Sequence, residues 1–322
     1  MATDFHPAVS CRDLTKRYNA EVLGIEDLSF DIPYGKVTGL LGPNGAGKST
    51  TVNVLTTAIR PTSGEFWIAG LHGKRDRLKI RNVLGIVSQD FAVDWALTVR
   101  QHLNVFASLY GKSADQANSE IDMWLNAFDL SGKADTKILQ LSGGQGRRVQ
   151  LIRCLLADPP IVFVDEPTLG LDPKGVQVVL NSLRQMASRG KCVVMASNAV
   201  EEVEAACDDV IFLRRGRLLD YDSVQHFLDR YGGLEVVTLT VVSDTVPDVM
   251  WWGTYLDPEI EEIGPRMWQI SFSVDDARGA VPSLVDLAFR SGLTISDVSV
   301  KSKTLKNIYL NLSSIERSEN GE

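Results

Sequence analysis

Apolar positions follow two patterns in the first two thirds of the chain. Short, continuous apolar runs, typical of strands buried on both faces, occur at Val37–Leu41, Ile161–Val164, Cys192–Ala196 and Val210–Leu213. Between residues 99 and 130, apolar residues instead recur at helical spacing. Because helical stretches alternate with the strand-like runs, the pattern predicts an α/β fold with a mostly parallel sheet covered by helices.

The pattern changes after Gly232-Gly233, which is the best candidate for a domain boundary. Strand-like runs follow, then a helical stretch and another strand-like run, which together predict a small α+β domain. The last residues are polar and are expected to fray. We therefore expect a first domain over residues 1–232, an accessory domain over residues 233–315 and a flexible tail over residues 316–322.

Composition narrows the possible partners. The chain carries 33 basic and 41 acidic residues, a net charge of −8, which argues against binding to nucleic acid. Its four cysteines are widely spaced, so neither a zinc site nor a disulfide framework is indicated. No apolar run reaches the roughly 18 residues that a membrane span needs. We expect a cytoplasmic protein whose membrane role, if it has one, depends on a partner.

A glycine-rich loop follows the apolar run Val37–Leu41 and precedes a helical stretch expected from Thr50 to Ile59. In this strand–loop–helix context, backbone N–H groups of the loop point at the phosphates of a nucleotide. Lys48 adds positive charge for the β- and γ-phosphates, and Ser49 can ligate Mg²⁺. The loop therefore predicts ATP binding by Gly42, Pro43, Asn44, Gly45, Ala46, Gly47, Lys48, Ser49 and Thr50.

Two carboxylates end the apolar run Ile161–Val164. Asp165 and Glu166 would lie at the carboxyl end of a buried strand, where ligands bind in open α/β sheets. We expect Asp165 to hold Mg²⁺ through water. Glu166 is expected to orient or deprotonate the attacking water.

A second anion-binding device follows the glycine loop in sequence. Ser142, Gly143, Gly144 and Gln145 precede a helix that is expected to begin near Arg147. Serine and two glycines at a helix N-terminus favour a bound anion. One nucleotide does not need two such devices from one chain, so we expect a head-to-tail dimer in which this segment covers the ATP of the other copy.

Together these motifs resemble the ATP-binding cassette (ABC) ATPases over residues 9 to about 232. The resemblance implies a P-loop NTPase with a RecA-like core, an antiparallel β edge and a helical subdomain over about residues 96–156. It also implies roles for three further residues. Tyr18 would stack on adenine, although a core tyrosine remains the alternative; Gln89 would contact Mg²⁺ and sense the membrane partner; Asp172 would cross the dimer interface.

One position departs from the family pattern. The family usually places a histidine near the γ-phosphate in a pattern like T-H-x-x-E-E, and this chain has Asn198 there. Asparagine can donate a hydrogen bond but cannot become cationic. We expect Asn198 to take part in catalysis but to support slower hydrolysis, with ATP binding and dimerisation unaffected.

The run Leu97–Leu103 and the C-terminal segment Thr304–Leu312 resemble the ATPases of ABC-2 type exporters, such as drug-resistance and nodulation-factor export subunits. The resemblance implies an ATPase, working with ATP and Mg²⁺, that forms a homodimer or paired cassette beneath separate membrane-spanning subunits. It would be peripheral, on the cytoplasmic face, without touching the cargo. An importer ATPase and a non-transport, ATP-switched interaction protein are the alternatives.

Overall fold

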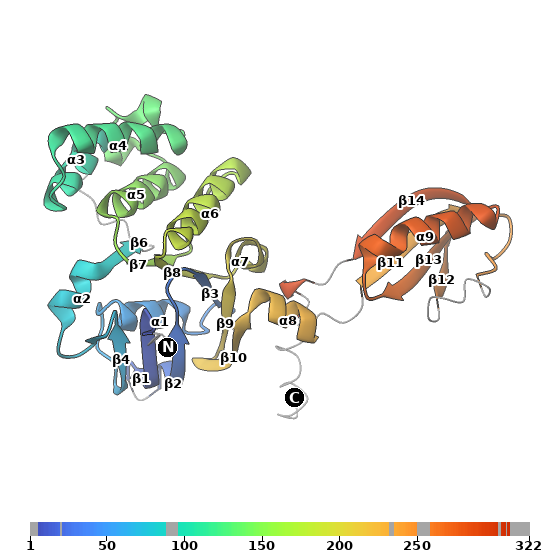
Figure 1. Cartoon of the computed structure of the whole chain (residues 1–322), viewed down its shortest axis with the longest axis horizontal. Helices are drawn as coiled ribbons and strands as arrows, with labels where there is room; N and C mark the ends of the chain where they lie inside the picture. Colours follow the sequence, from blue (N-terminus) through green and yellow to red (C-terminus); the bar gives the residue numbers. More distant parts are fainter. Residues whose placement is uncertain are drawn as a thin grey trace, which may run out of the picture. The chain divides into compact units, whose positions relative to one another are not determined.

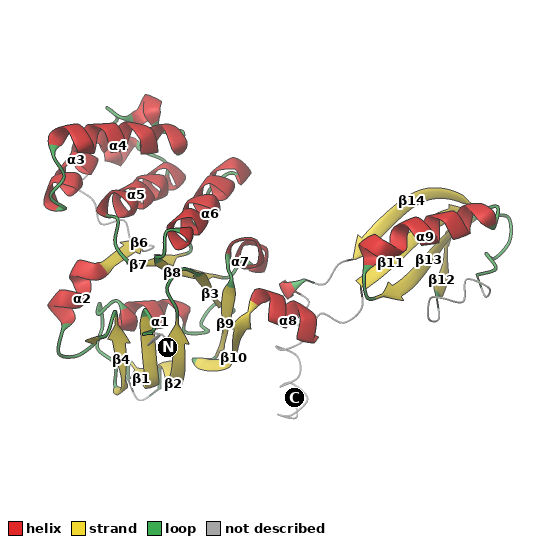
Figure 2. Ribbon diagram, viewed as in Figure 1, coloured by secondary structure: helices red, strands yellow, loops and turns green. Residues whose placement is uncertain are grey.

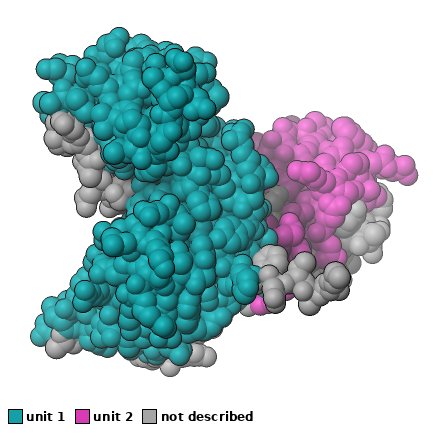
Figure 3. Space-filling view, turned by 60° about the vertical axis from the view of Figure 1, so that its left-hand side comes forward, with its two compact units in different colours: residues 1–224 teal, residues 225–322 magenta. Residues whose placement is uncertain are grey.

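The computed structural model describes residues 6–19, 21–87, 96–231, 235–249, 258–301, 304–306 and 308–309. These residues form two compact units, Met1–Val224 and Gln225–Glu322 (Figure 3). Each unit has its own sheet and its own apolar core. The described residues contain no helix long and apolar enough to cross a membrane.

The central sheet of the first unit has six strands in the order β10-β9-β3-β8-β7-β6. Neighbouring strands are parallel except for β10, which pairs antiparallel with β9. The four apolar runs in the sequence form β3, β7, β8 and β9, and the prediction of a mostly parallel sheet is confirmed (Figure 1). The strand bounds are β3 Val37–Leu41, β6 Leu84–Val87, β7 Ile161–Asp165, β8 Cys192–Ser197, β9 Asp209–Arg214 and β10 Arg217–Ser223.

Helices cover both faces of this sheet. Neighbouring residues of a strand point to opposite faces of the sheet. The contacts of two consecutive β3 residues therefore show which helix covers each face. A Cβ on Gly39 would lie 2.7 Å from the Val203 side chain of α7 (Val200–Ala206). Leu40, the next residue, belongs to the core that includes Val52 and Val54 of α1 (Lys48–Leu55). Helices α1 and α7 therefore lie on opposite faces, and α6 (Pro173–Ser188) packs beside α7.

A second, antiparallel sheet in the order β2-β1-β4-β5 completes the core of the first unit. Buried side chains from these strands, such as Leu14, Ile25 and Phe66, pack in the same cluster as Leu40 and Phe163 of the central sheet. Helix α2 follows β5 and leads into β6. The bounds are β1 Val9–Arg17, β2 Leu23–Ile32, β4 Ser63–Ile68, β5 Leu71–His72 and α2 Arg77–Val83.

Three helices form a separate bundle in the first unit, seen in red at the upper left of Figure 2. Each begins with a capping box, in which the side chains of the cap residue and of the third helical residue bond each other's backbone N–H. The bounds are α3 Val99–Leu109, α4 Ala114–Ala127 and α5 Gly143–Ala157, with short 3₁₀ turns at Ser131–Lys133 and Ile138–Gln140.

Two expected helix bounds were wrong. Helix α5 begins at Gly143 rather than near Arg147, because the Ser142 and Gln145 side chains close a capping box there. Helix α1 ends at Leu55 rather than Ile59, because Thr57 adopts a left-handed backbone with φ of 62° that stops the helix. The Thr57 carbonyl then accepts a hydrogen bond from Arg77.

The second unit is an α+β sandwich. Its antiparallel sheet has the order β12-β13-β11-β14, and α9 packs on one face through Leu284 and Ala288. The helical stretch expected in this part of the chain is α9, and Pro282 lies inside it. The bounds are α8 Val224–Tyr231, β11 Glu235–Val242, β12 Glu259–Gly264, β13 Met267–Val274, α9 Ala277–Arg290 and β14 Thr294–Lys301.

Candidate functional site

The glycine loop lines a pocket of about 370 Å³ in the first unit. The segment before β2, the start of α1 and the residue after β7 contribute the other walls. Residues that lie far apart in the sequence, Tyr18, the glycine loop and Glu166, therefore meet at one place. The lining residues are Tyr18, Val22, Leu23, Gly24, Asn44, Gly45, Ala46, Gly47, Lys48, Ser49, Thr50 and Glu166.

Two loop glycines are required by geometry. Gly47 has φ of 103°, and a Cβ there would lie 2.7 Å from the carbonyl oxygen of Gly24. Gly42 lies against strand β9, where a Cβ would come within 2.3 Å of the Leu213 carbonyl oxygen. A side chain at either position would collide with these backbone oxygens and shift the loop. The observed loop conformation therefore requires glycine at both positions.

Lys48 is held inside the loop. Its Nζ donates to the carbonyl oxygens of Gly42 at 2.7 Å and Pro43 at 3.2 Å. Burial lowers the pKa of the Lys48 ammonium, and the nearby carboxylates Glu166 and Asp165 oppose that shift. The Lys48 ammonium is therefore held by the backbone of the loop. Phosphate oxygens of a bound nucleotide can replace the two carbonyl oxygens that it contacts.

Glu166 follows β7 in a strained conformation. Its backbone has φ of 48°, which is uncommon for a residue with a side chain, and its N–H donates to the Ala196 carbonyl of β8 at 2.8 Å. Burial raises the pKa of the Glu166 carboxyl, whereas Lys48 and a hydrogen bond from the backbone N–H of Asn198 lower it. A carboxylate with a raised pKa beside the phosphate-binding loop suits a general base.

Asp165 ends β7 with a side chain only 8% exposed. Its Oδ1 is buried and has no hydrogen-bond partner among the described residues. A buried carboxylate oxygen without a partner is costly, and a cation or its water shell would satisfy it. Ser49, which is exposed, lines the pocket, and Asp165 directly precedes Glu166, which also lines it. Hydroxyl and carboxylate oxygens are the ligands that Mg²⁺ prefers.

Tyr18 stands at the edge of the pocket. Its ring is 51% exposed, and its hydroxyl lies 3.2 Å from the Thr50 Oγ1 at the start of α1. The Lys16 Nζ lies 5.3 Å from the centre of the ring. The alternative of a core tyrosine does not match this exposure, and an open aromatic face beside the phosphate loop is available for stacking on a base.

Arg147 is a site residue that the sequence pattern did not reveal. Its side chain is 7% exposed, in the second turn of α5. Burial lowers the pKa of its guanidinium, and the charges of Asp165 and Glu166 oppose that shift. An arginine in a helix usually faces solvent, so only its burial and the influence of these two carboxylates distinguish Arg147.

The Ser142–Gln145 segment lies outside the pocket. Ser142 accepts from the Gln145 N–H at 3.3 Å, and the Gln145 side chain accepts from the Ser142 N–H at 3.1 Å, so both side chains cap α5. Gly143 has open space around its Cα, and a Cβ on Gly144 would come within 2.8 Å of the Gly170 carbonyl oxygen. The segment is therefore packed on the loop that precedes α6.

Asp172 caps α6 and is tied to α5. Its Oδ1 accepts from the Gly175 N–H at 3.1 Å and from the Arg148 guanidinium at 2.6 Å. Asp172 does not line the nucleotide pocket. Its bond to Arg148 places it near the N-terminal part of α5, which the Ser142–Gln145 segment begins. The two elements that were expected to act on a second copy form one connected surface of this chain.

The remaining predicted residues are Asn198 and Gln89. Asn198 directly follows β8 with an exposed side chain, and its backbone N–H contacts Glu166. The next turn is tied back to the site, because the Thr168 hydroxyl hydrogen-bonds to the Glu202 carboxylate of α7. Gln89 lies outside the described residues.

Comparison with known proteins identifies these elements. Residues 25–169 match the family model described as ABC transporter. The Nod factor export ATP-binding protein I of Mesorhizobium japonicum is 34% identical over 232 residues, which cover 72% of this chain and 68% of that protein. The daunorubicin resistance ATP-binding protein DrrA3 of Streptomyces coeruleorubidus is 30% identical over 96% of this chain and 97% of its own length.

A solved structure shows the same fold. It is a dimeric, post-hydrolysis state of an ATP-binding cassette bound to ADP and Pi. Its sequence is 26% identical to this chain, and the TM-score is 0.60. The alignment covers 67% of this chain and 98% of the solved chain. Its alignment confirms a P-loop NTPase core of the cassette type.

Proposed function

The chain belongs to the ABC transporter family as an ATPase, and we propose that it is the ATP-hydrolysing subunit of an ABC-2 type exporter. The observation that carries the ATPase assignment is the single pocket that brings Lys48, Tyr18 and Glu166 together. The exporter assignment is supported by two relatives, one a Nod factor export protein and the other a daunorubicin resistance protein.

Each group of the pocket has a part in hydrolysis. The N–H groups of the glycine loop and the Lys48 ammonium bind the β- and γ-phosphates, and Tyr18 stacks on the adenine. Glu166 accepts a proton from the attacking water, because its carboxylate lies in the pocket and its raised pKa makes it a better base. When bound by Ser49, Asp165 and Gln89, Mg²⁺ would neutralise charge on the phosphates.

A second copy completes the site. The N-terminus of α5, with Ser142, Gly143, Gly144 and Gln145, lies outside the pocket of its own chain, and so does Asp172. In a head-to-tail dimer these groups face the γ-phosphate held by the other copy, where a helix N-terminus stabilises negative charge. The dimeric cassette bound to ADP and Pi supports this arrangement.

Asn198 sets a slow rate in this proposal. Its backbone N–H positions Glu166, and its side chain contacts the γ-phosphate without a cationic form to offset developing charge. Hydrolysis is therefore slower than with histidine, whereas binding and dimerisation do not depend on this side chain. ATP-driven closure of the two copies then acts on separate membrane-spanning subunits at the cytoplasmic face.

Glu166→Gln tests the assignment of the pocket. The variant keeps the size of the side chain but removes the base, so ATP hydrolysis should fall by about 10²–10⁴-fold. ATP affinity should stay within about twofold, because the phosphate contacts come from the glycine loop. Steady-state phosphate release and equilibrium ATP binding measure the two quantities, with Glu201→Gln, an exposed glutamate of α7, as the matched control. Hydrolysis at the original rate in Glu166→Gln would overturn the role of Glu166.

A further inference from the structure

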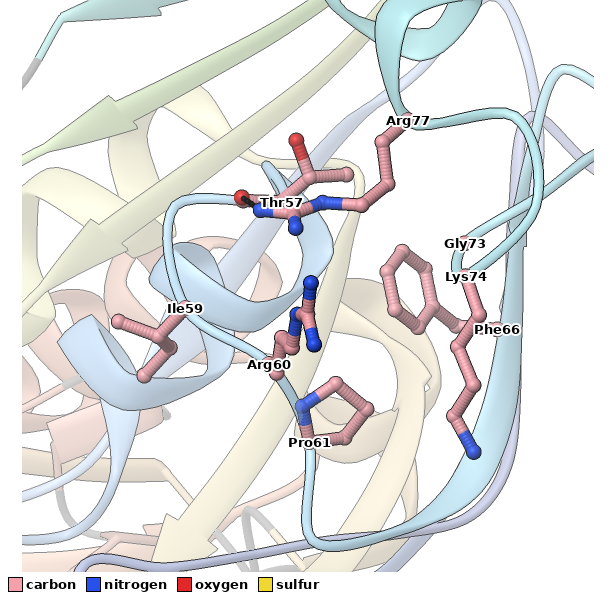
Figure 4. Close-up of a pocket in the computed structure, with 8 residues that line it drawn as sticks. All are labelled: Thr57, Ile59, Arg60, Pro61, Phe66, Gly73, Lys74 and Arg77. Atoms are coloured by element: carbon pink, nitrogen blue, oxygen red, sulfur yellow. Dashed lines mark hydrogen bonds between the residues drawn. The ribbon is translucent and has the colours of Figure 1, made fainter.

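The first unit contains a second pocket, of about 380 Å³, that shares no lining residue with the nucleotide pocket. It lies between the segment that joins α1 to β4 and the segment that joins β5 to α2 (Figure 4). Its volume is in the range that holds small-molecule ligands. The lining residues are Thr57, Ile59, Arg60, Pro61, Phe66, Gly73, Lys74 and Arg77.

Among the described residues, eight line the pocket, and three of these are basic and none is acidic. This positive charge contrasts with the net negative charge of the whole chain. Residues 60–81 contain six basic and two acidic residues, in a chain whose net charge is −8. A concave site with one sign of charge concentrates ions of the opposite sign.

The two nearby carboxylates are already engaged elsewhere. Asp76 accepts from the His72 N–H at 3.2 Å and forms an ion pair with Lys79 at 3.1 Å. Glu65 lies 3.4 Å from the His72 imidazole. Neither carboxylate lines the pocket, so its positive charge is not neutralised by the side chains that line it.

Part of the wall is rigid and buried, whereas the Arg60 and Lys74 side chains that face it are exposed. Thr57 is 1% exposed, its carbonyl accepts from Arg77 at 2.8 Å, and its hydroxyl accepts from Arg81 at 3.3 Å. Phe66 is 2% exposed, and Gly73 lies so close that a Cβ there would come within 2.3 Å of the Phe66 ring. Only glycine therefore leaves the aromatic wall in place.

Figure 4 shows the Arg60 guanidinium and the Phe66 ring facing the same space, with Pro61 below and Lys74 along the other side. Arginine matches a phosphate with two parallel hydrogen bonds, and lysine adds a point charge. Ile59, Pro61 and Phe66 add an apolar surface beside these cations.

We propose that this pocket binds a small phosphate-bearing molecule with an apolar portion, at a site separate from ATP. Arg60 and Lys74 bind the phosphate group, Arg77 keeps Thr57 in place, and the partly exposed Ile59 and Pro61 contact the apolar portion. The proposal does not depend on the exporter function, because it rests only on the lining of this pocket.

Phenyl phosphate is a suitable probe, because it joins a phosphate dianion to an apolar ring. It is titrated calorimetrically into the full chain with the nucleotide pocket saturated by MgADP, at about 0.15 M salt, where charges farther apart than about 8 Å are screened. Saturable binding at one site per chain is expected, and phenol should bind at least tenfold more weakly. No saturable binding, or equal binding of phenol, would overturn the proposal.

Matched variants identify the site. Arg60→Gln and Lys74→Gln should each weaken phenyl phosphate by about tenfold or more, the effect of one charged hydrogen bond. Arg75→Gln removes the same charge from a residue that does not line the pocket, and should change affinity by less than about threefold. Unchanged affinity in Arg60→Gln and Lys74→Gln, or an equal loss in Arg75→Gln, would contradict the proposal. MgADP affinity and melting temperature show that each variant is folded.

Discussion

At the scale of single residues, the charges around Glu166 explain why it can act as a base. Burial raises the pKa of its carboxyl, while Lys48 and the Asn198 N–H hold part of that shift back. Arg147 adds a buried cation within electrostatic reach of Glu166 and Asp165. Burial and the carboxylates of Asp165 and Glu202 therefore raise the pKa of Glu166, whereas Lys48 and the Asn198 N–H lower it.

This balance predicts the pH dependence of hydrolysis. The unprotonated carboxylate is the active form, so the rate is full above the pKa of Glu166 in the folded chain and is lost as pH falls through it. Because that pKa is raised, the acid limb should lie above the ordinary glutamate value of about 4.3. A profile of kcat against pH measures the limb, with ATP binding followed at each pH. An acid limb at or below the ordinary value would contradict the role of burial.

Asn198→His tests the departure from the family pattern. Histidine adds a side chain that can carry positive charge beside the γ-phosphate, so kcat should rise by about tenfold or more. That increase lies within the few kcal/mol by which one such contact stabilises a transition state. ATP affinity should be unchanged. Single-turnover phosphate release compares the two chains, and Asn198→Gln, which keeps the amide, is the control. No increase with histidine would show that Asn198 does not limit the rate.

At the scale of elements, the glycine loop and its flanks could be predicted from sequence. A continuous apolar run, a glycine loop and a helix in that order have few structural solutions, and β3, the loop and α1 follow that order. The carboxylates after β7 could be placed for the same reason. The burial of Arg147 could not be predicted, because it depends on packing with elements that lie far away in sequence.

Helix ends were harder to predict than helices. The N-terminus of α5 depends on a hydrogen-bonded pair, Ser142 and Gln145, and not on the apolar period that indicated the helix. The C-terminus of α1 depends on the backbone of Thr57, which is held by two arginines from α2. Both ends are set by polar contacts that an apolar pattern does not contain.

Gly47→Ala tests the geometry of the loop. At φ of 103°, and with the Gly24 carbonyl 2.7 Å from the new methyl group, the loop must shift, so ATP affinity should fall at least tenfold. Gly35→Ala is the matched control, because Gly35 also has a positive φ, of 77°, but has no atom within 4 Å of a new Cβ. Gly35→Ala should lower stability by a similar amount and leave ATP affinity unchanged. Equal loss of ATP affinity in both variants would contradict the account.

At the scale of the whole molecule, the arrangement of motifs implies an assembly. The pocket gathers the glycine loop, Tyr18 and Glu166, whereas Ser142, Gly144 and Asp172 form a separate surface of the same unit. A chain that carries both halves of a site, but not together, is consistent with the proposed dimer. In that proposal ATP acts as the contact between the two copies, and its hydrolysis releases them.

Sedimentation of Glu166→Gln with and without MgATP tests this account most directly. The variant should hydrolyse ATP very slowly, so a closed dimer should accumulate with MgATP, hold two ATP, and revert to monomer when ATP is removed. Ser142→Arg in the same background should bind ATP as a monomer, because the added side chain blocks the contact with the second copy. A Glu166→Gln chain that binds ATP and stays monomeric at every concentration tested would contradict the central claim.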